Sequence, residues 1–330
     1  MINLRQTINL RAMLPDVSQN LPSYGLGLFW AFKNATQIEL HSNHISSKVF
    51  VPAWSAGQSK AKVFELTQTS AAAIRTLDLS TNGTNGLDTG SVAVQKFYNI
   101  RMISKADGSD ISLLATLNGA SPNLPAGFTD GYVSDVIWGV ACCVELTPGG
   151  STYDDISPFM NNAPGVCNYG GGYYGSPGPS DAHKILTNGA ATVSTAVDLS
   201  YLAPEPVANT ARSSRGTIRL YCRGHNDHTA ARNGYIIYSF DGRLDTDPNV
   251  SHSNLYQFQK LDNDAGEGGR DQTTTINFPN AVASTPSGTT PGGVGYNAST
   301  GDLTNILQYK WQGTASCQMN IWVAGWTLDG

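Results

Sequence analysis

Short runs in which apolar and polar residues alternate recur along most of the chain, and helical periodicity is almost absent. In residues 26–32 every second position is Leu, Trp or Phe, and a turn at Lys33-Asn-Ala-Thr36 leads into a second alternating run at 37–41. These two runs predict a β-hairpin. Further runs bounded by Gly, Asn, Asp, Pro and Ser predict strands at 48–51, 62–67, 75–79, 97–104, 111–117 and 134–146.

The alternating pattern lapses between residues 147 and 183, where segments such as Asn168-Tyr-Gly-Gly-Gly-Tyr-Tyr-Gly175 predict an irregular linker. Strand patterns resume at 184–187, 191–199, 216–223, 235–240, 254–261, 273–278, 305–311 and 317–327. The sequence therefore predicts an all-β protein with two antiparallel β-sandwich domains of jelly-roll-like form. The expected parts are an N-terminal docking arm at 1–23, a first sandwich at 24–146, the linker at 147–183 and a second sandwich at 184–330.

The composition supports a folded chain with an unusual surface. Of its 330 residues 40% are hydrophobic, which excludes intrinsic disorder. Only 14% are charged, against about 25% in an average soluble domain, and Ser, Thr, Asn and Gly take their place. Such a surface is typical of β-rich extracellular or virion proteins. The net charge of −5, with no basic block to neutralise phosphates, argues against a nucleic-acid partner.

Targeting signals and cysteine motifs change the predicted fold and function little. The first 20 residues lack the basic start and apolar run of a secretory signal, so we expect none. The longest apolar stretch, near 26–32, is shorter than the roughly 20 residues of a membrane helix, so we expect no membrane insertion. The five cysteines form no C-x-x-C pair. We expect them to be reduced, with Cys142 and Cys222 as small core residues.

Candidate catalytic and metal-binding motifs are weak. The pairs His41-Ser-Asn-His44 and His225-Asn-Asp-His228 have metal-ligand spacing, but no third ligand follows either pair. The acidic clusters at 241–247 and 262–267 depart from the EF-hand pattern, so we interpret them as solvated turns, with calcium binding as the alternative. No nucleophile or phosphate-binding motif is present. Asp154 and Asp155 could supply the two carboxylates of a glycosidase, but nothing in the sequence singles them out for this role. We therefore predict no enzyme activity, no catalytic residue, no cofactor and no metal site.

Exposed aromatic residues are the remaining candidates for recognition. Tyr169, Tyr173 and Tyr174 lie in a Gly-rich segment that cannot bury all three rings locally. Exposed aromatic rings stack on sugars or anchor in partner pockets, so these residues are the predicted contacts for a host-surface glycan or a partner protein. The alternative is that the three rings pack between the two sandwiches or against a neighbouring subunit.

Two motifs carry a family resemblance. The first is Gly86-Leu-Asp-Thr-Gly-Ser-Val-Ala93, followed by Phe97-Tyr98. The second runs from Leu113-Leu-Ala-Thr116 through Pro122-Asn-Leu-Pro-Ala-Gly-Phe-Thr129 to an apolar strand with Gly139. Their order and spacing resemble a module of phage and prophage tail-fibre-like proteins. The family often has a Lys-Arg pair after that Thr, and this chain has Asp130-Gly-Tyr132 instead, so no contact of such a pair is carried over.

The C-terminal half resembles the sandwich that often follows this module, ending in a Gly-Trp corner within Met319-Asn-Ile-Trp-Val-Ala-Gly-Trp-Thr327. The resemblance implies a non-enzymatic structural protein of a phage virion, in a tail fibre, spike or other appendage that displays loops for host attachment. By analogy it also implies a homotrimer and contacts with other virion proteins. Two alternatives stay open, namely a capsid decoration or head-fibre protein that stabilises the shell, and a carbohydrate-binding module.

Overall fold

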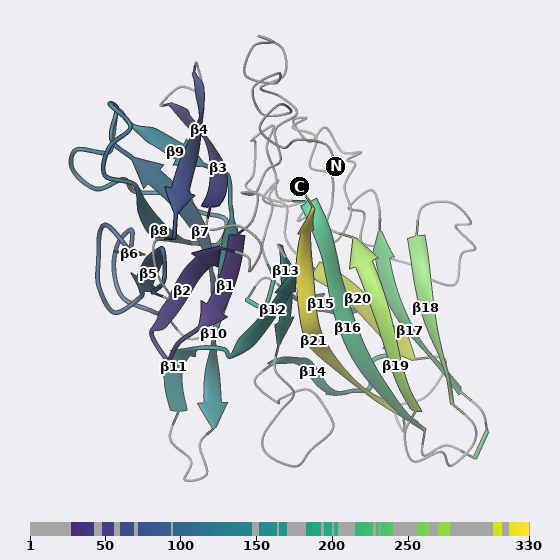
Figure 1. Cartoon of the computed structure of the whole chain (residues 1–330). Coiled ribbons are helices and arrows are strands. Elements are labelled where there is room, and N and C mark those ends of the chain that lie inside the picture. The colour runs from purple at the N-terminus through teal and green to yellow at the C-terminus, as the bar shows by residue number, and fades with distance from the viewer. Residues whose placement is uncertain are drawn as a thin grey trace.

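Figure 1 shows the computed structural model of the chain, which is built from β-sheets. The structure describes residues 28–42, 48–55, 60–68, 72–93, 95–146, 152–163, 165–169, 183–192, 195–199, 201–203, 215–226, 229–230, 232–239, 256–263, 270–277, 306–311 and 317–329. Within these ranges there is no α-helix, and hence no helix that is long and apolar enough to cross a membrane. The predicted all-β fold class is confirmed.

The N-terminal half contains two sheets. A three-stranded antiparallel sheet has the order β1-β2-β5, and a larger eight-stranded sheet has the order β11-β10-β7-β9-β3-β4. In the larger sheet β8 also pairs with β7, and β6 pairs with β8. The strands are β1 (Leu28–Phe32), β2 (Gln37–Ser42), β3 (Lys48–Ser55), β4 (Ala61–Thr67), β5 (Arg75–Asp78), β6 (Gly86–Leu87), β7 (Lys96–Ser104), β8 (Ser112–Leu117), β9 (Tyr132–Ser134), β10 (Trp138–Leu146) and β11 (Thr152–Ile156).

The C-terminal half also contains two sheets. One has the order β12-β13-β21-β16-β19, with β14 attached to β21, and the other has the order β15-β20-β17-β18. The strands are β12 (Phe159–Ala163), β13 (Val166–Tyr169), β14 (Lys184–Gly189), β15 (Thr195–Asp198), β16 (Arg215–Asn226), β17 (Arg232–Ser239), β18 (Tyr256–Asn263), β19 (Arg270–Asn277), β20 (Ile306–Trp311) and β21 (Cys317–Asp329).

The predicted first hairpin shows why the alternation is informative. The Asn34 side chain accepts hydrogen bonds from the backbone nitrogens of Thr36 and Gln37 at 3.0 and 2.9 Å, which closes the turn. This turn sets the register in which Phe32 pairs with Ile38. Alternate residues of the hairpin, including Leu28 and Trp30, then point into the core, so the hairpin prediction is confirmed.

The predicted linker at 147–183 is not irregular over its described part. Residues 152–156, 159–163 and 166–169 form β11, β12 and β13, so this part of the prediction is wrong. The physical reason lies in the partners. β11 pairs with β10 of the first half, whereas β13 pairs with β21 at the other end of the chain. Pairing with adjacent strands, and for β13 also with the distant β21, therefore orders a segment whose composition disfavours strands.

The main hydrophobic core of the described residues runs through both halves. Buried residues of all four sheets belong to one cluster, which extends from Leu28 to Leu328. β12 lies at the junction, where the Asn161 side chain accepts a hydrogen bond from the backbone nitrogen of Trp30 at 2.8 Å. The same side chain donates to the carbonyl of Val166 at 2.8 Å. In Figure 1, β12 and β13 accordingly lie between the N-terminal sheets and β21.

Candidate functional site

The structure places one of the three candidate tyrosines, and it is buried. Tyr169 ends β13 and is 8% exposed, within the shared core. Its hydroxyl donates to the carbonyl of Leu202 at 2.6 Å and accepts from the indole nitrogen of Trp326 at 3.2 Å. Tyr173 and Tyr174 lie outside the described residues. The expectation of an exposed ring is therefore corrected for Tyr169, because long-range contacts cover it, and for the other two it stays a prediction.

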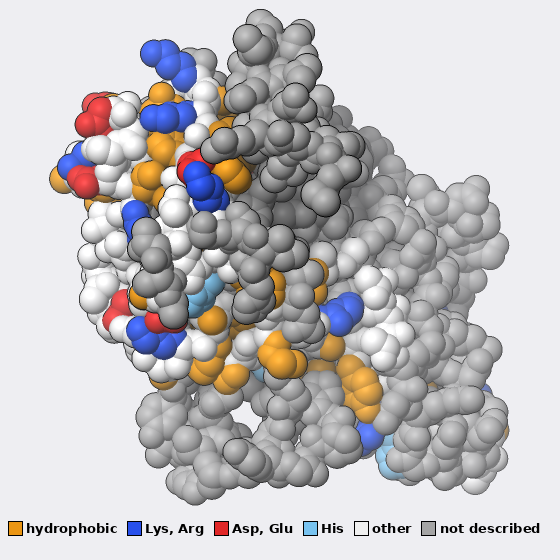
Figure 2. Space-filling view, viewed as in Figure 1, with side chains coloured by type: hydrophobic (Ala, Val, Ile, Leu, Met, Phe, Trp, Pro, Cys, Tyr) orange, Lys and Arg blue, Asp and Glu red, His pale blue; other side chains and the backbone are white. Residues whose placement is uncertain are grey.

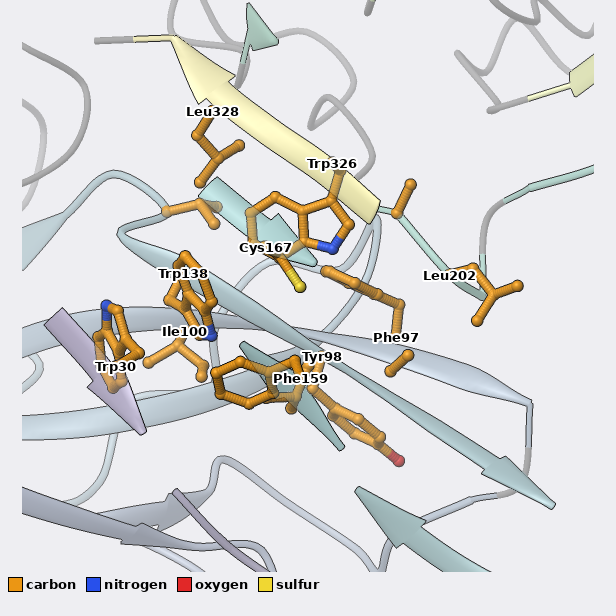
Figure 3. Packing of buried hydrophobic residues seen from close by; sticks show 14 of the residues in the cluster. Trp30, Phe97, Tyr98, Ile100, Trp138, Phe159, Cys167, Leu202, Trp326 and Leu328 are labelled. Carbon is orange, nitrogen blue, oxygen red and sulfur yellow. The ribbon is translucent and has the colours of Figure 1, made fainter. Parts of the chain in front are cut away.

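A group of aromatic side chains that includes Trp138 and Trp326 joins the two halves (Figure 3). The Trp326 ring of β21 lies 4.7 Å from the Trp138 ring of β10 and 5.9 Å from the Phe97 ring of β7, measured between centroids. Trp138 in turn stacks on Trp30 of β1 at 6.0 Å. Trp138 and Trp326 are fully buried. The C-terminal strand thus contributes the ring that packs directly on the N-terminal sheet.

A β-bulge in β21 aims Trp326 into this junction. Leu220 pairs with Val323 but Arg219 pairs with Gly325, so β21 has one extra residue at position 324. Because side chains alternate along a strand, the extra residue moves Trp326 to the face that Val323 already occupies. Gly325 has a φ of 150°, and a Cβ at this position would lie 2.2 Å from the carbonyl oxygen of Cys167. The Gly-Trp corner singled out in the sequence is therefore this bulge.

Replacing Gly325 with alanine is expected to lower the free energy of unfolding by about 3 kcal/mol, because the new Cβ is strained and meets backbone. Gly90→Ala is the matched control. Gly90 also has a positive φ, of 79°, but a Cβ there meets nothing within 4 Å. We expect a loss of about 1 kcal/mol for the control. Urea denaturation of both variants tests this, and equal losses would contradict the close approach of β21 to β13.

His183 is the most unusual titratable group near the junction. It is 2% exposed, and its ring stacks on Tyr169 with centroids 4.4 Å apart. Neither ring nitrogen has a hydrogen-bond partner in the described structure. Burial lowers the pKa of His183 from 6.5 to about 4. The imidazole is therefore neutral at pH 7, and its protonation requires a change in the packing around Tyr169.

The depressed pKa of His183 predicts acid destabilisation. As the pH falls from about 6.5 towards 4, the unfolded chain binds a proton that the folded chain does not. The free energy of unfolding therefore falls as the pH falls, and by about pH 4 it is lower by about 3 kcal/mol than at neutral pH. Urea denaturation at a series of pH values should show a steeper fall for the unaltered chain than for His183→Gln. Parallel pH profiles would contradict this prediction.

The two motifs of the family resemblance meet in space. Asp88, in the first motif, accepts a hydrogen bond from the backbone nitrogen of Asn123, in the second, at 3.0 Å and 35 positions away. Just before Asp88, the backbone nitrogen and the side-chain oxygen of Asn85 both bond to the main chain of Leu113 on β8. Asp88 of the first motif thus holds the loop at Asn123, and Asn85, just before this motif, holds its own loop against β8.

The second motif includes a long turn between β8 and β9. Phe128 is buried with Ile103 and Leu114 in a small hydrophobic cluster separate from the main core. The turn is tight, because the backbone nitrogen of Phe128 donates to the carbonyl of Pro125 at 3.0 Å and Gly127 has a φ of 85°. Phe128 therefore anchors the turn to β7 and β8.

The described parts of the metal candidates do not converge. His41 lies beside Glu39, at 3.2 Å between Nε2 and Oε2, and Glu39 also pairs with Lys33 at 2.8 Å. This lysine is the main reason that the pKa of Glu39 is lowered. His44 and His228 lie outside the described residues, as do most residues of the two acidic clusters. Among the described residues, no three His, Cys, Asp or Glu side chains form a group that could hold a metal ion.

Four cysteines, Cys142, Cys167, Cys222 and Cys317, are buried free thiols. Burial raises the pKa of Cys167 and of Cys222 above that of an ordinary thiol. Both therefore stay protonated at neutral pH and are poor nucleophiles. The prediction that Cys142 and Cys222 are small core residues is confirmed.

Charges on the visible surface are mixed. In Figure 2, Lys and Arg side chains lie among Asp and Glu side chains over the N-terminal half. Several are paired, such as Lys48 with Glu65 and Lys105 with Asp110. These exposed ion pairs contribute little to stability.

Sequence reasoning missed one group of polar residues, Asn99, Arg101 and Thr116. Asn99 and Arg101 lie on β7 and Thr116 on β8, and each has a buried polar atom without a partner in the described structure. No motif marks these residues. The only available signal was the presence of Asn, Arg and Thr at positions that alternation assigns to a covered face of the sheet.

Comparison with known proteins leaves the chain without a family. No protein-family profile and no curated protein sequence matches it. Among solved structures, the crystal structure of the T13 viral particle of infectious bursal disease virus is 14% identical, with a TM-score of 0.21. That match covers 93% of this chain and 66%, just under two thirds, of the other. A second structure, of the Gx strain, is 12% identical, with a TM-score of 0.13, and covers 97% of this chain and 86% of the other. Likenesses this weak carry no argument about fold or function.

Proposed function

We propose that this chain is a non-enzymatic structural protein of a phage virion, part of a tail fibre, spike or similar appendage that displays loops for host attachment. Its partners would be other virion proteins and further copies of itself, as a homotrimer by analogy with such appendages. The protein would be made in the host cytoplasm and assembled into the particle.

The observation that carries this proposal is the hydrogen bond between Asp88 and Asn123. It links the two motifs on which the resemblance to tail-fibre-like proteins rests. If the two motifs belong to one module that occurs in many proteins because of its fold, they are expected to contact each other and build one structural unit. Phe128 supports the same interpretation, since it fastens the second motif to the sheet through its own hydrophobic cluster.

The hydrogen bonds of Asp88, and of Asn85 just before the first motif, also favour a structural function. The side chains of Asn85 and Asp88 accept hydrogen bonds from the backbone of neighbouring segments. The partners in these two bonds are main-chain nitrogens, not a carboxylate or a histidine. Groups engaged in this way stabilise loops. A rigid β-framework that supports loops is what an attachment protein requires.

Gold labelling of this protein in intact purified particles, viewed by electron microscopy, tests the proposal. We expect label at the tail tip or on side fibres. Label spread over the icosahedral shell would instead support the alternative of a capsid decoration or head-fibre protein, and would overturn the appendage assignment. Particles without label, from infected cells that contain the protein, would overturn a virion role altogether.

Host glycan contact is proposed for Tyr173 and Tyr174, two aromatic residues in the Gly-rich segment. Replacing both with alanine should reduce binding to host-surface glycans at least tenfold on a glycan array, because each stacked ring contributes of the order of 1 kcal/mol. Tyr169→Phe is the matched control. The Tyr169 ring is buried, so its variant should bind like the unaltered chain. Intact binding by the double variant would rule out the aromatic contact.

A further inference from the structure

One row of side chains crosses four strands of the C-terminal sheet that contains β21. In the strand register Trp322 of β21 is opposite both Lys184 of β14 and Tyr221 of β16. Tyr221 is in turn opposite Thr273 of β19. Residues directly opposite each other in neighbouring strands share a face, so these four residues form one row, the outer row. Because neighbouring strands are about 4.8 Å apart, the outer row spans about 14 Å.

Contacts within the outer row hold a positive charge beside two aromatic rings. The ring centroids of Tyr221 and Trp322 are 5.3 Å apart, with the ring planes tilted by 57°. The Lys184 ammonium lies 4.9 Å from the centroid of the Trp322 ring, a cation–π contact. Trp322 is only 8% exposed, so it forms the floor between Lys184 and Tyr221. The half-buried Tyr221 is thus the accessible ring of the row.

The outer row lies on the face of the sheet that points away from the core. Leu220 and Cys222, on either side of Tyr221 in β16, are buried in the core, so Tyr221 points the other way. Thr273 and Arg223 are exposed. Figure 2 shows this side of the molecule, with hydrophobic side chains over β14, β16 and β21 and Lys, Arg and His side chains beside them. The Asp and Glu side chains coloured in that view lie over the N-terminal half.

This face carries more positive than negative charge, although the net charge of the chain is −5. Arg219 and Arg223 lie two positions to either side of Tyr221 on β16, so they flank the outer row on the same face. With Lys184 they make three positive residues. In the described pairings one acidic residue, Asp271, is opposite this part of β16. A negatively charged ligand is therefore attracted to this face more than to the rest of the chain.

We propose that the outer row binds an acidic carbohydrate, an oligosaccharide whose sugars carry carboxylates. The Tyr221 ring stacks on the apolar C–H face of one sugar. The Lys184 ammonium pairs with a carboxylate at one end of the row. At the other end the Thr273 hydroxyl donates to and accepts from sugar hydroxyls. An extended oligosaccharide fits a flat row that presents a charge, a ring and a hydroxyl in this order.

Other ligands match the outer row less well. Single-stranded nucleic acid needs open rings on which successive bases stack, but Lys184 covers Trp322 and the Tyr221 ring is tilted from it. A neutral sugar would use the ring and the hydroxyl and would leave the Lys184 charge unused. An acidic peptide would use the charges and would leave the Tyr221 ring without a sugar face to stack on.

The site does not depend on the proposed role in a virion. It uses no residue of the Gly-rich segment that contains Tyr173 and Tyr174, and a free carbohydrate-binding protein would use it equally. Failure of carbohydrate binding would therefore leave the result of gold labelling unchanged, and particles without label would leave the binding result unchanged.

Isothermal titration calorimetry of the full chain with oligogalacturonate tests the proposal. The methyl ester of the same oligosaccharide is the matched ligand, because it has the same sugar rings without the charges. We expect oligogalacturonate to bind at least about tenfold more tightly at low ionic strength, and the difference to shrink as salt is added. Equal binding of the two ligands, or binding of neither, would overturn the proposal. Tighter binding of oligothymidylate or of polyglutamate would assign the face to a nucleic acid or an acidic protein and would also overturn it.

Variants of the outer row identify the residues that bind. Tyr221→Ala should weaken oligogalacturonate binding about tenfold, whereas Tyr221→Phe keeps the ring and should bind like the unaltered chain. Lys184→Gln should abolish the preference for oligogalacturonate over its methyl ester. Lys60→Gln is the matched control, since Lys60 is an exposed lysine next to β4 and its loss changes the net charge equally.

Unchanged binding by Tyr221→Ala, or an equal loss of preference in Lys60→Gln and Lys184→Gln, would overturn the assignment of the outer row. The comparison of oligogalacturonate with its methyl ester uses the unaltered chain. It therefore decides the proposal whether or not a variant folds.

Discussion

Replacing Trp326 with alanine is expected to lower the free energy of unfolding by about 3–5 kcal/mol, the range for a fully buried tryptophan. The change removes the ring that contacts Trp138 and Phe97 across the junction. It also deprives the Tyr169 hydroxyl of the indole donor at 3.2 Å. Since folded domains are stable by only about 5–15 kcal/mol, this loss removes a large part of the total.

Met160→Ala is the control for the Trp326 variant. Met160 is 58% exposed on β12, at the same junction, so its truncation should change stability by no more than about 0.5 kcal/mol. Urea denaturation followed by circular dichroism is the suitable measurement, because the variant itself alters tryptophan fluorescence. If Trp326→Ala cost no more than Met160→Ala, the packing of β21 on the N-terminal sheet would be wrong.

Strand positions were predictable where local alternation and the buried face agree. In β1 and β2, the residues that alternate as apolar in the sequence are those that the core buries, and Asn34 closes the turn between them. The β21 pattern was equally clear, since Met319, Ile321 and Val323 all point inward. In such strands a one-residue shift would expose the whole apolar set, so the pattern determines the register.

The strands at 152–169 could not be predicted from local sequence. Their Asn, Gly and Pro content favours turns, and one of them, β13, pairs not only with the adjacent β12 but also with β21, far along the chain. Cys167 pairs with Trp326, a residue 159 positions away, as their numbers show. No local pattern encodes such a partner, and the inward direction of Trp326 depends on the bulge at position 324 of the same strand.

The prediction that the Tyr169 ring is exposed was wrong for the same reason. Its Gly-rich neighbours indicated that no local structure would cover the ring, which is correct as far as local structure goes. The cover comes instead from His183, Trp326 and the carbonyl of Leu202. The polar groups of Asn99, Arg101 and Thr116 were likewise invisible, because a buried polar atom differs from an exposed one only in its three-dimensional surroundings.

The shared core predicts that the C-terminal half does not fold alone. An isolated fragment of residues 184–330 keeps β14 and β16 beside β21, but it lacks β13, the third partner of β21. It also lacks the rings of Trp138 and Phe97 that pack on Trp326. We expect the fragment to show no cooperative urea transition and poorly dispersed amide resonances. The full chain should unfold in a single transition, with the same midpoint for both halves.

A longer fragment separates the two causes of this instability. Residues 152–330 restore β12 and β13 but still leave Trp326 without Trp138, so the fragment should regain slowed amide exchange in β13 and β21 at a stability below that of the full chain. If instead the 184–330 fragment unfolded cooperatively at the midpoint of the full chain, the halves would be independent domains. The buried rings of Trp138 and Trp326 would then add nothing to the stability of the C-terminal half, contrary to the stabilisation expected from burying apolar surface.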